Sequence, residues 1–290
     1  MTRFGSVLQT QWDWRAANNF MFGGAGGALI LMIGLTHSSQ MPSILLSFTA
    51  LALLGIGLGS VWLEIGRPWR FFNVAFHPQT SWMTREGLVA MLLFACALAA
   101  IALQQITLLA VAGLLGLLFL YCQGRILLAS KGIPAWRERT VAPLILTTGL
   151  AEGSAICGTL LIAVGAGTSW TGELLAVLLL VRGWAWVNYN KALVASGAPR
   201  AALQALAAIH KPFLYVGTVL PLALSAIYLF TGEPIALVAA AIPAVLSGWQ
   251  MKFTIITRAA QVQGYSMGKL KKGRPLMKPP VRRAGDPWRN

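Results

Sequence analysis

The sequence predicts an all-α, polytopic membrane protein with eight transmembrane helices. Of its 290 residues, 57% are hydrophobic, and the 30 glycines raise the apolar share to about two thirds, against roughly 45–50% in soluble domains. Charged residues make up 11%, which leaves too few polar side chains to cover a soluble fold. The mean hydropathy is +0.67. The apolar runs lack strand-like alternation, which argues against an outer-membrane barrel.

Eight apolar runs are long enough to cross a bilayer, which takes roughly 20 residues. They cover about 18–37, 43–64, 87–105, 107–129, 143–165, 172–195, 212–231 and 234–256. Only Gln104 and Gln105 separate the third run from the fourth. Asp13 precedes the first run and no cleavage site closes it, so we interpret that run as a span rather than a signal peptide. The predicted organisation is an interfacial or cytoplasmic N-terminal segment, an eight-helix membrane domain and a basic cytoplasmic tail: 1–17, 18–256 and 257–290.

Basic residues are confined to alternate connections between the runs. The net charge is +15, and Lys and Arg occur in the N-terminus, in the second, fourth and sixth connections and in the tail. The other four connections contain neither. The positive-inside rule therefore places both termini and all long loops in the cytoplasm. Membrane topology explains the charge better than nucleic-acid binding, which such a charge would suggest in a soluble protein. We expect the tail to lie on anionic lipid or on a partner.

The second connection gathers polar and aromatic side chains at the predicted cytoplasmic boundary. Glu64 closes one helix and Glu86 opens the next, and between them or beside them lie Arg67, Trp69, His77, Trp82 and Arg85. This set suits a quinone headgroup, because a carboxylate can relay protons, an arginine can hold a carbonyl oxygen and a tryptophan can stack on the ring. The alternative is an interfacial belt, in which Trp and Arg anchor helix ends and Glu86 favours a helix N-terminus.

Two ionisable residues are expected near the middle of the bilayer. Glu152 lies about ten residues into the fifth run, and Arg182 about ten into the sixth, counted from the opposite face. An ionisable group at this depth indicates a functional site by default. If their helices are neighbours, the two can pair, either as a structural ion pair or as part of a proton relay. Asn18 and Asn19 are expected in an amphipathic entry helix in the interface, and 188–190 at the interface or along a cavity.

Two glycine patterns predict faces that let helices approach closely. Gly23 and Gly27 have the spacing of such a face in the first run, and Gly55 and Gly59 have it in the second. Small residues at this spacing favour helix contact in membranes.

The histidines and cysteines argue against a redox centre in this chain. A b-type haem needs axial ligands inside the bundle, whereas all three histidines lie at or beyond helix ends: His37, His77 and His210. The three cysteines lie inside apolar runs without metal-ligand spacing, so we interpret them as small core residues: Cys96, Cys122 and Cys157. We therefore expect no haem or metal here, and electrons would come from the cofactor of another subunit.

Two motifs carry a family resemblance. The pattern L-E-I-G-R-P-x-R-x-x-N over 63–73, followed by P-x-T-S-W-M-x-R-E over 78–86, resembles the NrfD/DmsC family of membrane anchor subunits of molybdopterin oxidoreductases. The segment Q-W-D-W-R-A-A-N-N-F over 11–20 is similar to the membrane subunit of phenylacetyl-CoA:acceptor oxidoreductase. The resemblance covers nearly the whole chain, and it implies that the membrane domain consists of two four-helix bundles, with halves about 18–129 and 143–256.

The resemblance implies partners and a location. The partners would be a molybdenum- or tungsten-pterin catalytic subunit and a four-cluster ferredoxin-like iron–sulfur subunit, docked on the cytoplasmic face of the bacterial inner membrane. The pterin and the iron–sulfur clusters would belong to those partners, and this chain would be the non-catalytic, quinone-reactive subunit that passes electrons to menaquinone or ubiquinone.

The resemblance also implies roles for individual residues. The quinone site would use Glu86 and Arg67 with Gly66, and Glu64 fills a position where the DmsC branch has histidine. Glu86 and Glu64 would supply protons, Arg67 would hold the quinone carbonyl, and Trp82 or Trp69 would wall the ring.

Two other functions remain open. The first is a proton-translocating variant of the same anchor, with Glu152 and Arg182 on the proton path. The second is a small-molecule transporter. Transporters usually have matched helix breaks in their two halves, and Pro221 and Pro243 in the last two runs have no clear counterparts in the third and fourth.

Overall fold

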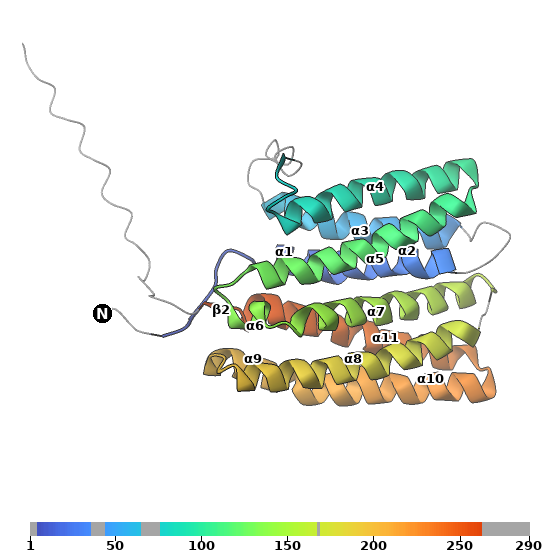
Figure 1. Cartoon of the computed structure of the whole chain (residues 1–290). Coiled ribbons are helices and arrows are strands. Elements are labelled where there is room, and N and C mark those ends of the chain that lie inside the picture. The colour runs from blue at the N-terminus through green and yellow to red at the C-terminus, as the bar shows by residue number, and fades with distance from the viewer. Residues whose placement is uncertain (1–4, 36–43, 65–75, 167–168, 263–290) are drawn as a thin grey trace, which may run out of the picture.

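The computed structural model describes residues 5–35, 44–64, 76–166 and 169–262, in which long helices lie side by side (Figure 1). Within these residues, eight helices are long and apolar enough to cross a membrane: Trp14–Leu35, Ile44–Glu64, Trp82–Leu103, Ile106–Ala129, Val141–Ala163, Trp170–Ala195, Arg200–Thr231 and Pro234–Arg258. The prediction of an all-α fold with eight membrane spans is confirmed. The division into two four-helix bundles and the cytoplasmic termini stay predictions.

Several spans consist of more than one helical element. The first comprises α1 (Trp14–Asn18), the π-helical turn η1 (Asn19–Gly23) and α2 (Gly24–Leu35), and the seventh comprises α9 (Arg200–Leu214), η3 (Tyr215–Val219) and α10 (Leu220–Thr231). The remaining elements are α3 (Ile44–Glu64), α4 (Trp82–Leu103), α5 (Ile106–Ala129), α6 (Pro134–Arg137), α7 (Val141–Ala163), α8 (Ser169–Ala195), α11 (Pro234–Phe253), η4 (Thr254–Arg258), and the antiparallel pair β1 (Val7–Leu8) and β2 (Gln261–Val262).

The ends of the spans differ from the predicted bounds where a helix extends beyond the apolar run. Ser81 caps α4 by accepting a hydrogen bond from the Thr84 amide, so this helix begins at Trp82, before the apolar run does. The seventh span begins at Arg200 because α9 is amphipathic, and hydropathy alone does not detect such a helix. The break between the third and fourth spans is where we expected it, with Gln104 in the left-handed region at φ 54°.

Small residues let α2 pack deeply among its neighbours α3, α5 and α7. A side chain on Gly116 of α5 would meet the carbonyl of Gly27 on α2, so the predicted Gly23 and Gly27 face is a real contact. The predicted Gly55 and Gly59 face is wrong, because a Cβ at either position would meet no atom within 4 Å. The residue between them, Gly57, faces the backbone of Gly23 instead.

Adding a methyl group at the α2 and α5 contact should loosen the bundle. In Gly116→Ala the new Cβ would collide with backbone, which cannot move aside as a flexible side chain can. We expect a loss of about 1–3 kcal/mol, the usual effect of overpacking. Thermal unfolding of the purified protein measures it, with Gly55→Ala as the matched control because that position faces open space. Equal unfolding midpoints for the two variants would contradict this packing.

The two ends of the helical bundle differ in charge. Most of the described basic residues lie at the end of α1, α6 and α9 (Figure 1), and we call it the basic end: Arg15, Arg85, Arg125, Lys131, Arg137, Arg139, Lys191, Arg200, Lys211 and Arg258. The described residues of the opposite end include Glu173 and Glu233 but no Lys or Arg. The β1 and β2 pair fastens the N-terminal segment to the chain beyond η4, also at the basic end.

Candidate functional site

Five of the eight predicted site residues belong to the described part of the chain, and they lie at the basic end: Glu64, His77, Trp82, Arg85 and Glu86. The other three fall outside the described residues: Gly66, Arg67 and Trp69.

Glu86 is the buried member of this group. It lies on the first turns of α4, and only 5% of it is exposed. Asn19, the first residue of η1, donates a hydrogen bond from Nδ2 to Glu86 Oε1 at 2.9 Å. Gln123 of α5 donates from Nε2 to the main-chain oxygen of Asn19 at 2.8 Å. Asn19 of η1 therefore holds the buried carboxyl group directly, and Gln123 of α5 holds Asn19.

Asn19 is buried inside the helix bundle, so the prediction that it lies in an interfacial entry helix is wrong, whereas Asn18 is partly exposed. Asn18 donates from Nδ2 to Ser60 Oγ of α3 at 3.3 Å, while Asn19 faces α4. The turn at Asn19 is π-helical, a local widening that is frequent at functional sites. The adjacent asparagines thus connect the helix that ends at Glu64 with the helix that carries Glu86.

Glu64 remains at the boundary of the bundle, half-buried as the last residue of α3. Arg15 donates to the carbonyl of Leu63 at 3.0 Å and forms an ion pair with Asp13 at 2.9 Å. The Arg15 guanidinium holds the pKa of Asp13 below its usual range, mainly through their side-chain hydrogen bond. Glu64 therefore lies beside a charged, partly exposed pair, whereas Glu86 accepts a hydrogen bond from Asn19 inside the bundle.

Trp82 is enclosed by cationic side chains. The guanidinium carbons of Arg85 and Arg125 lie 4.1 and 4.6 Å from its ring centroid, and Tyr121 meets the ring edge-on at 5.8 Å. Guanidinium groups this close to an aromatic ring are attracted by its electrons. These arginines occupy part of the ring surface that we expected a quinone to use.

Arg85 also fixes the loop before α4. It donates from Nε to the carbonyl of Pro78 at 2.7 Å and from Nη2 to that of Gln79 at 2.9 Å. His77 is exposed in this loop, and its carbonyl accepts from the amides of Thr80 and Ser81. The contacts observed for His77 are therefore backbone hydrogen bonds that stabilise the turn.

A second buried polar cluster lies deeper in the bundle. Lys252 Nζ of α11 lies 2.6 Å from Glu152 Oε2 of α7, and neither side chain is exposed. Arg182 of α8 is also fully buried, and it donates to the carbonyls of Ala244 (2.7 Å) and Gly217. The predicted pairing of Glu152 with Arg182 is therefore wrong. Lys252 lies within an apolar run as Glu152 does, but we did not predict it as a site residue from the sequence.

The carbonyl of Gly217 accepts a hydrogen bond from Arg182 because of the sequence that follows Gly217. In a regular α-helix the donor to this carbonyl would be the amide of residue 221, which is proline and has no N–H. The buried guanidinium supplies a donor instead.

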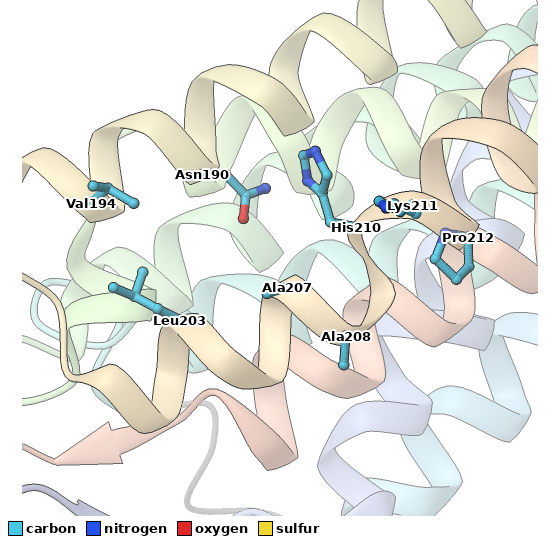
Figure 2. A pocket seen from close by; sticks show the side chains of 8 residues that line it. All are labelled: Asn190, Val194, Leu203, Ala207, Ala208, His210, Lys211 and Pro212. Atoms are coloured by element: carbon cyan, nitrogen blue, oxygen red, sulfur yellow. The ribbon is translucent and has the colours of Figure 1, made fainter.

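A separate hollow of about 470 Å³ lies between α8 and α9 at the basic end (Figure 2). Its lining residues are Asn190 and Val194 of α8 with Leu203, Ala207, Ala208, His210, Lys211 and Pro212 of α9. His210 accepts a hydrogen bond at Nδ1 from Trp186 Nε1 at 3.1 Å. Asn190 therefore lines a cavity, one of the two alternatives that the sequence left open, while Tyr189 is buried and donates to the carbonyl of Ala135.

The described residues contain no group of three or more His, Cys, Asp or Glu side chains that could hold a metal ion. Cys122 and Cys157 are buried, as expected of core residues, and Cys96 is partly exposed.

The family model of the DMSO reductase anchor subunit, DmsC, matches residues 26–246 of the chain. The chain belongs to the DmsC family. DmsC-family proteins are the membrane anchor subunits of molybdopterin oxidoreductases, so this chain is part of an oxidoreductase complex with catalytic and iron–sulfur partners. No curated protein matched the chain in a separate sequence comparison. The matched stretch includes Glu86 and Glu152, whereas Asn19 and Lys252 lie outside it.

The DmsC family is quinone-reactive in general, and the residues around Glu86 fit a quinone. A carboxylic acid is a hydrogen-bond donor when protonated and an acceptor when ionised, so Glu86 suits both a quinone carbonyl and a quinol hydroxyl. Two buried acceptors beside it, Asn19 Oδ1 and Gln123 Oε1, have no hydrogen-bond partner. Buried polar atoms are normally satisfied, which suggests a polar ligand or water at this place.

Proposed function

We propose that this chain seats a quinone at the basic end of the bundle, beside Glu86, and that electrons reach it from the iron–sulfur subunit of the complex. The observation that carries the proposal is the buried Glu86 carboxyl group with its Asn19 donor. A carboxyl group this close to the membrane boundary can exchange protons with water and still contact a lipid-soluble molecule. The bound quinone supplies two-electron, two-proton chemistry.

The chain's own residues have distinct tasks in this proposal. Glu86 gives a proton to the quinone oxygen, and Asn19 fixes the orientation of its carboxyl group through the 2.9 Å hydrogen bond. Gln123 fixes Asn19 in turn. Glu64, half-buried at the boundary, takes protons from water and passes them inward. Arg67, Gly66 and Trp69 stay predicted members of the site.

The basic end is also the proposed docking face for the partners. Its excess of Lys and Arg supports a cytoplasmic orientation in the bacterial inner membrane, because basic residues favour the cytoplasmic side and its anionic lipids. Docking here brings the terminal iron–sulfur cluster to the same end as Glu86.

Replacement of Glu86 by Gln should separate assembly from quinone chemistry. Gln is nearly isosteric and keeps a hydrogen bond with Asn19, but it cannot transfer a proton. We expect the complex to assemble normally and quinone-dependent turnover to fall about 100-fold, within the usual range for general acid–base groups. Turnover of the purified complex with a soluble quinone analogue measures the effect.

Glu173→Gln is the matched control, because Glu173 is exposed near the opposite end of the bundle. We expect this control to keep full turnover. If Glu86→Gln retained the activity of the unchanged protein, Glu86 would have no part in the reaction and the proposal would fail.

A further inference from the structure

The buried polar groups around Glu86 and those around Glu152 meet at Gly24, the first residue of α2. A Cβ at this position would lie 2.9 Å from Gln123 Oε1 and 3.0 Å from Lys252 Nζ. The two atoms are therefore neighbours across the glycine. Gln123 Oε1 has no hydrogen-bond partner, and one bridging water could join it to Lys252.

Lys252 has more N–H donors than its hydrogen bond with Glu152 uses. An ammonium group has three N–H donors, and the Lys252 ammonium gives one to Glu152 Oε2. Gln123 also lies within range of the Glu86 carboxyl group. A continuous row of polar groups thus runs from Glu86 past Gln123 to Lys252 and Glu152.

Arg182 is a further charged group beside this row of polar side chains. It lies close enough to Glu152 to interact electrostatically, and its acceptor Ala244 is one helical turn from Gly248, which borders the Glu152 carboxylate. Two cations therefore accompany one anion in the deep cluster. A guanidinium remains protonated in proteins, whereas a buried lysine can lose its proton. When Lys252 is neutral, Arg182 still balances Glu152.

We propose that Lys252 and Glu152 form an internal proton-exchange site that serves the quinone site through water hydrogen-bonded to Gln123. This rests on the proposed function. Quinone reduction takes two electrons from the partner iron–sulfur clusters and two protons. One proton leaves the Glu86 O–H, and the other leaves the Lys252 N–H, which becomes a neutral amine. Water at the basic end restores both protons through Glu86.

The row is closed toward the opposite end of the bundle. Ala244, the acceptor of Arg182, belongs to a cluster of buried hydrophobic residues from α7, α8, α10 and α11 that includes Leu175, Leu179 and Leu237. Such a layer excludes water and charged groups. These apolar residues favour proton exchange with the basic end, as in a proton store, over passage through the bundle, as in a transmembrane pump.

The first test is the double variant Glu152→Gln with Lys252→Met. It removes both exchanging groups, keeps their approximate sizes and leaves the summed charge of the deep cluster unchanged. We expect the complex to assemble and to bind a quinone analogue with unchanged affinity in a direct titration. Turnover should fall about tenfold or more, and the ratio of rates in H₂O and D₂O should rise.

The second test is Gly24→Ala, which leaves every titratable group in place. Its methyl group would lie between Gln123 and Lys252 and exclude a bridging water. Both neighbouring atoms are ends of flexible side chains, so the fold should tolerate the change. We expect the same loss of turnover and the same rise in isotope effect, with Gly55→Ala as the unchanged control.

A third measurement does not depend on turnover. Redox-difference infrared spectra of the complex should contain a carboxylate signal that disappears in the double variant, because loss of the Lys252 proton changes the surroundings of Glu152. Wild-type turnover and isotope effect in both variants would overturn the inference and leave the pair as a packing element. Proton release at the far side of liposomes would also overturn it.

The outcome for Glu86→Gln keeps the two proposals separate. If Glu86→Gln is impaired while the double variant and Gly24→Ala are normal, the quinone site stands and the proton store fails. If Glu86→Gln is normal, both fail.

Discussion

The single variant Glu152→Gln is expected to destabilise the protein by about 3–5 kcal/mol, the usual cost of removing one partner from a buried ion pair. Without the carboxylate, Lys252 and Arg182 become two neighbouring cations in a part of the bundle that solvent does not reach. The amount of protein in the membrane and the thermal unfolding midpoint of the purified chain measure the loss.

A double-mutant cycle isolates the ion pair from other effects of the substitution. Adding Lys252→Met to Glu152→Gln removes one of the two repelling cations, and we expect most of the lost stability to return. Lys252→Met alone should cost less than Glu152→Gln alone, because Arg182 remains to balance the carboxylate. Additive effects of the two substitutions would show that the 2.6 Å contact contributes nothing to stability.

The second large effect is expected for Arg182→Leu, at about 2–4 kcal/mol. The substitution takes away the donor that Arg182 gives to Gly217, whose regular helical donor is missing because residue 221 is proline. A buried carbonyl without a donor costs about 1–3 kcal/mol, and the smaller leucine adds a cavity. Thermal unfolding measures the total.

Arg258→Leu is the matched control for this prediction. Arg258 is exposed at the end of η4, and its guanidinium carbon lies 5.6 Å from the Phe253 ring centroid. Loss of an exposed contact of this kind should change stability by less than about 1 kcal/mol. If the two arginine variants were equally stable, the carbonyl of Gly217 would not depend on Arg182.

The fold could be predicted because the bilayer strongly restricts the structures that a spanning segment can adopt. Apolar runs of sufficient length and the alternation of basic connections were enough to define eight spans. The seventh span began earlier than predicted because Arg200, Gln204 and Lys211 interrupt the apolar pattern of α9, although its periodicity is that of an amphipathic helix. Which helices touch depended on individual glycines, and spacing alone chose Gly55 and Gly59 where the contact is at Gly57.

The candidate site could be predicted only in part. Glu86 stood out because a carboxylate at the start of an apolar run is unusual and belongs to a family motif. Gln123 and Lys252 did not stand out, because each is a single polar residue within an apolar run. Their significance depends on how α5 and α11 pack around Gly24. The pairing of Glu152 was wrong because depth in the membrane does not specify which neighbouring helix a side chain faces.

The most direct measurement of the central claim is covalent labelling by a photoreactive quinone. The intact complex is illuminated with the probe, and labelled peptides of this chain are identified by mass spectrometry. The account predicts labels in the segments around Asn19, Glu86 and Gln123, which excess unlabelled quinone should suppress. Labels confined to the hollow between α8 and α9, or to the end of the bundle opposite the basic end, would contradict it.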